Sequence, residues 1–233
     1  MVILGEEEWR YPALFERPGR VTALVCVTGP IAAGATTCCK RLAEVTGWQT
    51  ALETEVERNN PFFAPYHSDP RRYAFHNQIA FLAQSAEMHG RLVNEGTSKQ
   101  VLLQDFSPFE HIGVYGHVQA DQGLLTGDEF DVLQRVDALL SGAFILPGVL
   151  VYRSLPSDRL RDRVQNRARP SEQSLSIEFL EAVRKRFDEW ISEWKLSPVV
   201  RIDPDVDLLA DLTEVRRLVD VIRQTLGSDT SPG

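Results

Sequence analysis

The chain has 233 residues, of which 43 % are apolar and 25 % charged, and this composition excludes a disordered, collagen-like or coiled-coil protein. Its net charge of −8 argues against general binding to DNA or RNA, although a nucleotide-sized anion could still occupy a local basic pocket. No apolar run approaches the ~20 residues that span a membrane, so no membrane partner is expected.

Short apolar strands alternate with helical segments along most of the chain. We predict strands over residues 21–28, 49–53, 100–103, 149–153 and 199–202, and helices over 36–45, 71–92, 127–140, 175–194 and 211–226. This alternation predicts an α/β domain of three layers, in which a five-stranded parallel sheet is flanked by helices. The domain is expected to span 21–226, after an irregular segment 1–20 and before a loose tail 227–233.

The turn after the first strand resembles a phosphate-binding loop. Its glycines let the backbone N–H groups point inward, and the following helix adds its positive N-terminal end. The pattern GxxxxGK[ST] matches at every position except one, because Ala35 stands where lysine is expected, and Thr36 takes the place of the hydroxyl that holds Mg²⁺. The residues expected to bind phosphates are Gly29, Ile31, Ala32, Ala33, Gly34, Ala35, Thr36 and Thr37. The alternative is an ordinary strand-to-helix turn, and Lys40 is a poor geometric substitute for the lysine.

The cysteines indicate a reduced, cytoplasmic protein. Cys26, Cys38 and Cys39 are odd in number and two of them are adjacent, which does not suit a disulfide framework. The five histidines show no pairing at the spacing of a zinc site. The first ten residues are acidic and carry no signal-peptide pattern, so a cytoplasmic location is expected.

A second group of residues completes a resemblance to a known family. Glu55 stands five residues before an Asn-Pro pair, Tyr66 shortly before an Asp-Pro step, and Gln78 on the helix that follows. With the phosphate loop, this pattern resembles the deoxynucleoside kinases, the family of deoxyadenosine, deoxyguanosine, deoxycytidine and insect-type broad-specificity kinases. The resemblance runs from about Val21 to Leu226 and implies a P-loop NTPase-type fold with an arginine-bearing lid.

The resemblance implies roles in nucleoside binding and in catalysis. Glu55 corresponds to the carboxylate that takes the proton of the nucleoside 5′-hydroxyl as it attacks the γ-phosphate, and Glu53 is an alternative two residues earlier. Tyr66 matches the tyrosine near the sugar 3′-hydroxyl, and Gln78 matches the amide that hydrogen-bonds the base edge. Without the motif, Glu55 and Gln78 would be read as solvated surface residues.

The turn after the third strand departs twice from the family pattern. The family has Asp/Glu-Arg-Ser, whereas this chain has Asp105, Phe106 and Ser107. The resemblance makes Asp105 the acid that positions Mg²⁺, while Phe106 replaces the arginine that contacts the 5′-oxygen. The next acid of the family falls on His111, whose neighbour is Glu110. Phe106 and His111 are therefore expected on the substrate side of the site.

A basic segment after the fourth strand reproduces the lid of the family. Arg163, Arg167 and Arg169 have its spacing of i, i+4 and i+6, and three guanidinium groups can converge on transferring phosphate oxygens. Glu172 matches the acid that holds the sugar 3′-hydroxyl, and residues 201–207 resemble the loop that covers the adenine of ATP. The alternative is a solvated basic helix.

These residues predict a nucleoside kinase-like phosphotransferase. It would move the γ-phosphate of ATP, or of another NTP, with Mg²⁺ to the 5′-hydroxyl of a (deoxy)nucleoside or an analogue. Because Ala35 and Phe106 remove two cations, which could lower the rate about 10⁴-fold, a nucleotide-binding pseudokinase that acts as a regulatory or partner subunit stays open. A nucleoside monophosphate kinase ranks third, since its acceptor phosphate calls for extra basic residues. The resemblance also implies a homodimer, for which helices 71–92 and 127–140 are the candidate contacts.

Overall fold

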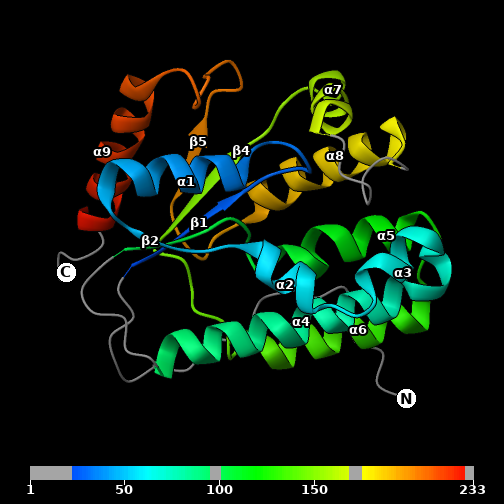
Figure 1. The fold of residues 1–233 in the computed structure, drawn as a ribbon. Helices are drawn as coiled ribbons and strands as arrows, with labels where there is room; N and C mark the ends of the chain where they lie inside the picture. Colours follow the sequence, from blue (N-terminus) through cyan, green and yellow to red (C-terminus); the bar gives the residue numbers. More distant parts are fainter. Residues whose placement is uncertain (1–22, 95–100, 168–174, 229–233) are drawn as a thin grey trace.

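The computed structural model describes residues 23–94, 101–167 and 175–228 (Figure 1). Its sheet has five strands in the order β2-β3-β1-β4-β5, and every neighbouring pair is parallel. The strands are β1 (Leu24–Thr28), β2 (Gln49–Ala51), β3 (Leu102–Gln104), β4 (Val149–Arg153) and β5 (Val199–Ile202). The predicted parallel α/β sheet is confirmed.

Ten helical segments connect and flank the strands within the described ranges. They are α1 (Ala35–Thr46), α2 (Glu53–Asn59), α3 (Phe63–Ser68), α4 (Pro70–Asn94), the π-helix η1 (His111–Gly116), α5 (His117–Asp121), α6 (Gly127–Ser141), α7 (Ser157–Arg167), α8 (Ile177–Glu193) and α9 (Leu212–Ser228). The helices α2, α3, η1 and α5 were not predicted, because segments of five to seven residues are too short to show an apolar period. Helix α7 was not among the predicted helices either, since its basic segment was interpreted as a lid and a basic helix was only the alternative. None of the helices in the described part is long and apolar enough to cross a membrane.

The predicted second strand is two residues too long. It was expected over 49–53, but β2 ends at Ala51, which pairs with Gln104 of β3. Glu53 instead opens α2, and its backbone N–H donates to the side chain of Asp105 rather than to a neighbouring strand. A side-chain acceptor therefore ends the ladder at this point.

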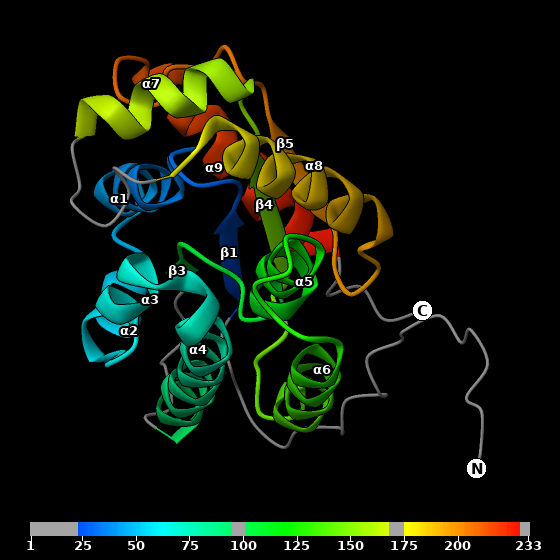
Figure 2. The same cartoon turned by 90° about the vertical axis from the view of Figure 1, so that its right-hand side faces the viewer.

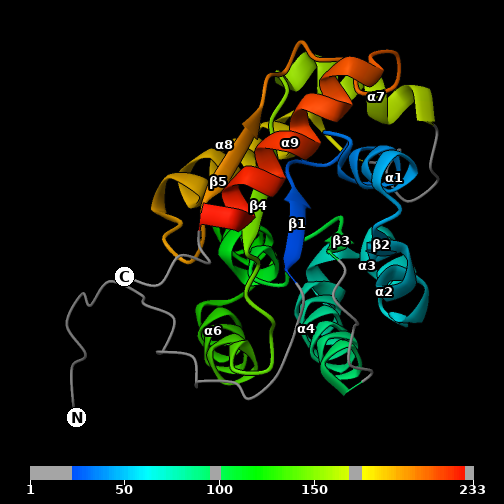
Figure 3. The same ribbon diagram turned by 90° about the vertical axis from the view of Figure 1, so that its left-hand side faces the viewer.

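The two faces of the sheet are covered by different helices (Figures 2 and 3). Alternate residues of β1 and β4 point to opposite faces, as the pleat of a strand requires. One face packs on α1 and α9, through Val25, Val27, Val149 and Val151. The other packs on α8, η1 and the α4–α6 layer, through Leu24, Cys26, Leu150 and Tyr152. Because both faces are buried, the inner strands are apolar throughout, which is why the sequence identified them.

The strand order sets the place of the site. β1 lies in the middle of the sheet, with β3 on one side and β4 on the other. The chain leaves β1 toward the β2 edge of the sheet and leaves the adjacent β4 toward the β5 edge, so a topological switch point lies between β1 and β4, and the carboxyl ends of β3, β1 and β4 lie side by side there. Thr28, Asp105 and Arg153 are brought together at these carboxyl ends.

Candidate functional site

The turn after β1 has the backbone of a phosphate-binding loop. The N–H of Ala33 donates to the carbonyl of Pro30 (2.8 Å), and Gly34 caps α1 with a left-handed φ of 100°. A Cβ on Gly29 would lie 2.0 Å from the carbonyl oxygen of Arg153, so only glycine fits there. Gly34 offers α1 no side-chain cap, which leaves the first N–H groups of the helix available to an anion.

A hydroxyl and a carboxylate meet beside this loop. Oδ1 of Asp105 accepts the N–H of Glu53 (2.6 Å), and the Thr36 hydroxyl lies near enough to the same carboxylate to lower its pKa by hydrogen bonding. Burial raises the pKa of Asp105, while these hydrogen bonds and the charge of Lys40 oppose the rise. Such oxygens suit Mg²⁺, which usually takes one or two protein oxygens and completes its shell with water and phosphate. No group of three or more His, Cys, Asp or Glu side chains in the described residues could hold a metal by itself.

The two candidate catalytic glutamates both lie on α2. Glu53 is the first residue of this helix, and its backbone N–H donates a hydrogen bond to the carboxylate of Asp105. Glu55 is also in α2, and its side chain lies outside the described part of the structure. The structure therefore brings the start of α2 to the phosphate loop, as both assignments require, and the choice between the two acids stays a prediction.

Three polar side chains form a chain in the helical layer below the loop. The Nε2 of Gln78 on α4 donates to Oε1 of Gln119 on α5 (3.0 Å), and the Nε2 of Gln119 donates to the hydroxyl of Tyr66 on α3 (3.0 Å). Gln78 is only 2 % exposed, and its Oε1 has no hydrogen-bond partner. Tyr66 and Gln78, predicted from the motif, are thus brought together. Gln119 was missed, since nothing in the spacing of its short helix marks it.

Phe106 and His111 lie in the core. Phe106 is fully buried, and its ring is 5.8 Å from that of His111. His111 Nε2 is 3.0 Å from the hydroxyl of Ser85, and its ring stacks on Phe81. Burial lowers the pKa of His111 to about 3, so the imidazole is neutral at physiological pH. Their predicted contact with a substrate stays a prediction.

Glu110 is a buried acid behind the loop that the sequence reading noted only as a neighbour of His111. Its carboxyl accepts the hydroxyl of Thr28, the last residue of β1, and the N–H of Ser107 (3.0 Å). Burial raises its pKa to about 8, and the nearby charge of Asp105 adds to the rise. The site therefore holds a mostly protonated acid at neutral pH.

The lid residues are described only in part. Arg163 on α7 donates to the carbonyls of Ala32 (3.4 Å) and Ala33 (3.3 Å), which places it against the phosphate loop, while its contact with a phosphate stays a prediction. Arg167 is exposed at the end of α7. Arg169 and Glu172 lie outside the described residues.

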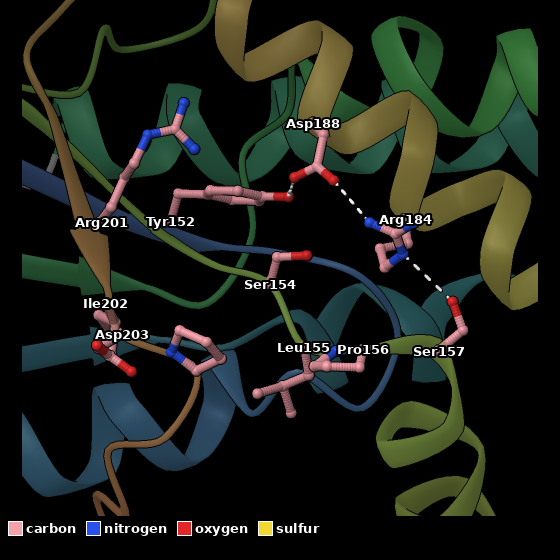
Figure 4. A pocket seen from close by; sticks show the side chains of 11 residues that line it. Tyr152, Ser154, Leu155, Pro156, Ser157, Arg184, Asp188, Arg201, Ile202 and Asp203 are labelled. Atoms are coloured by element: carbon pink, nitrogen blue, oxygen red, sulfur yellow. Dashed lines mark hydrogen bonds and ion pairs between the residues drawn. The ribbon is translucent and has the colours of Figure 1, made fainter.

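A cavity of about 790 Å³ lies between β4, β5 and α8 (Figure 4). Hydrogen bonds join its walls: the Tyr152 hydroxyl donates to Asp188 (2.7 Å), and Arg184 donates to both Asp188 (2.9 Å) and Ser157 (3.2 Å). The lining residues are Tyr152, Ser154, Leu155, Pro156, Ser157, Arg184, Asp188, Arg201, Ile202, Asp203 and Pro204. Apart from the start of the 201–207 segment, none of the predicted site residues borders it.

Comparison with known proteins decides the family. The sequence model described as "Deoxynucleoside kinase" matches residues 25–226. The chain belongs to the deoxynucleoside kinase family. It is 28 % identical to a deoxyadenosine/deoxycytidine kinase of Bacillus subtilis (strain 168) over 207 residues, which cover 88 % of this chain and 93 % of that one. It is 23 % identical to human mitochondrial thymidine kinase 2 over 219 residues, 89 % of this chain and 81 % of the other.

The fold agrees with that of solved deoxynucleoside kinases. A deoxyadenosine kinase from M. mycoides, solved with dCMP and dCDP, matches with a TM-score of 0.74 and 17 % identity, over 86 % of this chain and 99 % of that one. The same enzyme with bound dATP matches with a TM-score of 0.70 and 15 % identity, over the same shares. As a deoxynucleoside kinase, the chain is a transferase that acts on nucleosides, and nothing in these comparisons favours an inactive partner subunit.

Proposed function

We propose that this chain transfers the γ-phosphate of ATP, or of another NTP, to the 5′-hydroxyl of a deoxynucleoside. The observation that carries the proposal is the meeting of Thr36, Asp105 and the start of α2 at the phosphate loop. There the loop amides and the positive end of α1 receive the triphosphate. A glutamate of α2 stands where the attacking hydroxyl must lose its proton.

Thr36 and Asp105 are the residues that would hold Mg²⁺. When bound, the ion neutralises charge on the phosphate oxygens. We assign the lid residues Arg163, Arg167 and Arg169 to the oxygens of the transferred group. Of these, Arg163 already contacts the backbone of the loop.

Gln78 and Tyr66 form the acceptor half of the site. The unpartnered Oε1 of Gln78 can accept a hydrogen bond from an exocyclic amino group of a base. Gln119 orients this amide by accepting its N–H, and in turn donates to Tyr66, which we assign to the sugar together with Glu172. A base with an amino group on its Watson–Crick edge, such as adenine or cytosine, satisfies the free oxygen. A deoxynucleoside of this kind is the expected acceptor.

The proposal is tested by assaying the full chain with ATP·Mg²⁺ and deoxyadenosine, deoxycytidine, deoxyguanosine and thymidine. We expect 5′-monophosphate with the amino-bearing bases. Gln78→Ala should weaken nucleoside binding by roughly 1–3 kcal/mol, because it leaves a polar partner unpaired. Glu53→Gln and Glu55→Gln, measured side by side, identify the base, since only the true base should lower kcat strongly while leaving nucleoside affinity unchanged. Formation of no monophosphate from any of the four nucleosides would overturn the proposal.

The same reading extends to assembly and cellular role. We propose a homodimer formed through α4 and α6, because α6 presents Val132 (43 % exposed) and Leu139 (82 % exposed) on its outer side. We further propose a cytoplasmic enzyme of nucleotide salvage, since its proposed reaction converts a free deoxynucleoside into a nucleotide. Sedimentation of wild type and Leu139→Glu tests the dimer, which the charged variant should dissociate.

A further inference from the structure

A positive charge from another strand lies beside the phosphate loop that lacks its lysine. β4 runs next to β1, with Thr28 opposite Tyr152, so the following residue, Arg153, emerges beside the start of the loop. Its carbonyl oxygen lies 2.0 Å from the place that a Cβ of Gly29 would occupy. The end of β4 and the phosphate loop are therefore in direct backbone contact.

The guanidinium of Arg153 reaches the other end of the same loop. Its Nη1 donates to the carbonyl of Ala33 (3.2 Å) and lies 3.4 Å from the Cβ position of Gly34, the residue before Ala35. Its Nη2 donates to the carbonyl of Val206 (2.5 Å). The side chain is only 4 % exposed. The positive charge of Arg153 is thus held against Ala33 and Gly34, the two residues that precede Ala35, where the lysine is missing.

This charge forms no ion pair with a described residue, and the described carboxylate that acts on it, Asp207, lies beyond ion-pair distance. Neither Arg153 nor Arg163 has a carboxylate within 4.0 Å there, and both guanidinium groups bond only to backbone carbonyls. The Nε of Arg153 is buried without a hydrogen-bond partner. A buried charge that is only partly offset, here by Asp207, is costly, and it is tolerated where a ligand of opposite sign completes the site. Two such cations around inward-pointing N–H groups complement a polyphosphate.

We propose that Arg153 is a positioning residue for phosphoryl transfer and replaces the missing lysine of the loop. By holding the Ala33 carbonyl outward, it keeps the loop N–H groups turned toward the phosphates. It also adds a full positive charge beside the loop, which the backbone amides do not supply. The inference rests on the proposed function, because it concerns the donor side of that reaction. Its bond to Val206 additionally ties the loop to the 201–207 segment.

The alternative is that Arg153 only ties together two loops. The two roles differ in what can replace the side chain. If charge is required, Arg153→Lys should be tolerated, and Ala35→Lys should compensate for Arg153→Met by restoring the cation from the usual position. If only the hydrogen bonds to Ala33 and Val206 matter, neither lysine should help. Arg161→Met is the matched control, since Arg161 lies on α7 and is 46 % exposed.

The experiment compares wild type, R153M, R153K, R153M/A35K and R161M as full chains. Calorimetric titration with inorganic triphosphate and Mg²⁺ measures the anion site, and titration with the accepted deoxynucleoside measures the acceptor site. For R153M we expect at least tenfold weaker triphosphate binding, as loss of a charge-assisted contact implies, with deoxynucleoside affinity within about twofold of wild type. The turnover number should fall roughly 10²–10³-fold, as when one preorganised donor is removed. R153K should keep most triphosphate binding, R153M/A35K should recover at least about tenfold of the lost turnover, and R161M should match wild type.

Three results would overturn the inference. The first is triphosphate binding by R153M at the wild-type level. The second is that R153K binds neither triphosphate nor deoxynucleoside. This result would indicate a structural role for Arg153, and it can be read even if R153M fails to fold. The third is no recovery in R153M/A35K. If the wild type phosphorylates no nucleoside, the proposed function fails, and the triphosphate titration still decides whether Arg153 serves an anion site.

Discussion

A buried carboxyl on α6 should make this protein less stable as the pH rises. Asp137 lies between Leu133 and Ser141 on the buried stripe of the helix and is fully inaccessible. Neither of its carboxylate oxygens has a hydrogen-bond partner. Burial alone raises its pKa from 3.8 to about 7. The perturbation is Asp137→Asn, which keeps the shape and removes the ionisation.

The sign and size of the effect follow from linkage. The folded state binds the proton more tightly than the unfolded state, so the contribution of Asp137 to stability is present at low pH and is lost as the pH rises through about 7. Each tenfold change in the acid dissociation constant corresponds to about 1.4 kcal/mol, so the rise of the pKa from 3.8 to about 7 corresponds to roughly 4 kcal/mol in the free energy of unfolding. Between pH 5 and pH 8 the part that is lost is roughly 2–3 kcal/mol.

Urea unfolding of wild type and Asp137→Asn at pH 5, 6.5 and 8 measures this loss. The stability advantage of the variant over wild type should grow by roughly 2–3 kcal/mol between pH 5 and pH 8, where it should reach roughly 4 kcal/mol. Asp131→Asn is the control, because Asp131 is 55 % exposed on the same helix and pairs with Arg135 at the surface, where little energy is at stake. Curves that stay parallel across this pH range would refute the reasoning, since the carboxyl would then ionise in the fold as it does in water.

Three more outcomes are expected. Gly29→Ala should lose triphosphate binding in a calorimetric titration, because its Cβ would lie 2.0 Å from the Arg153 carbonyl, while Gly127→Ala, whose Cβ meets nothing within 4 Å, should bind as wild type. Glu110→Gln should flatten the pH dependence of unfolding between about pH 4.5 and 8, because the raised pKa of Glu110 makes its contribution to stability fall as the pH rises through about 8; an unchanged slope in chemical unfolding would contradict this assignment. Thr126→Ala should lower the free energy of unfolding by about 1 kcal/mol, as it removes the capping box with Glu129, and Thr225→Ser serves as a mild comparison in the same urea titration.

The site divides into features that local sequence predicts and features that depend on distant contacts. The phosphate loop belongs to the first group. Its two glycines, Gly29 and Gly34, and the N-terminus of α1 all lie within residues 29–37, and local backbone preferences shape this segment. Tyr66 and Gln78 were predicted only through the family motif. Their partner Gln119 was missed because it reaches them from a short helix 41 residues further along the chain than Gln78.

The sequence by itself determined the strands, the long helices and the loop between β1 and α1. Strands buried on both faces are apolar throughout, and amphipathic helices repeat every 3.6 residues, so both patterns are written in neighbouring residues. Only the tertiary structure showed which positive charge lies beside Ala35, where the lysine of the loop is missing. The order of the sheet puts β4 beside β1, and a pairing between segments more than 120 residues apart brings Arg153 to the loop. Local sequence contains no such information, because a residue 120 positions away contributes nothing to the period or the turn chemistry from which an element is predicted.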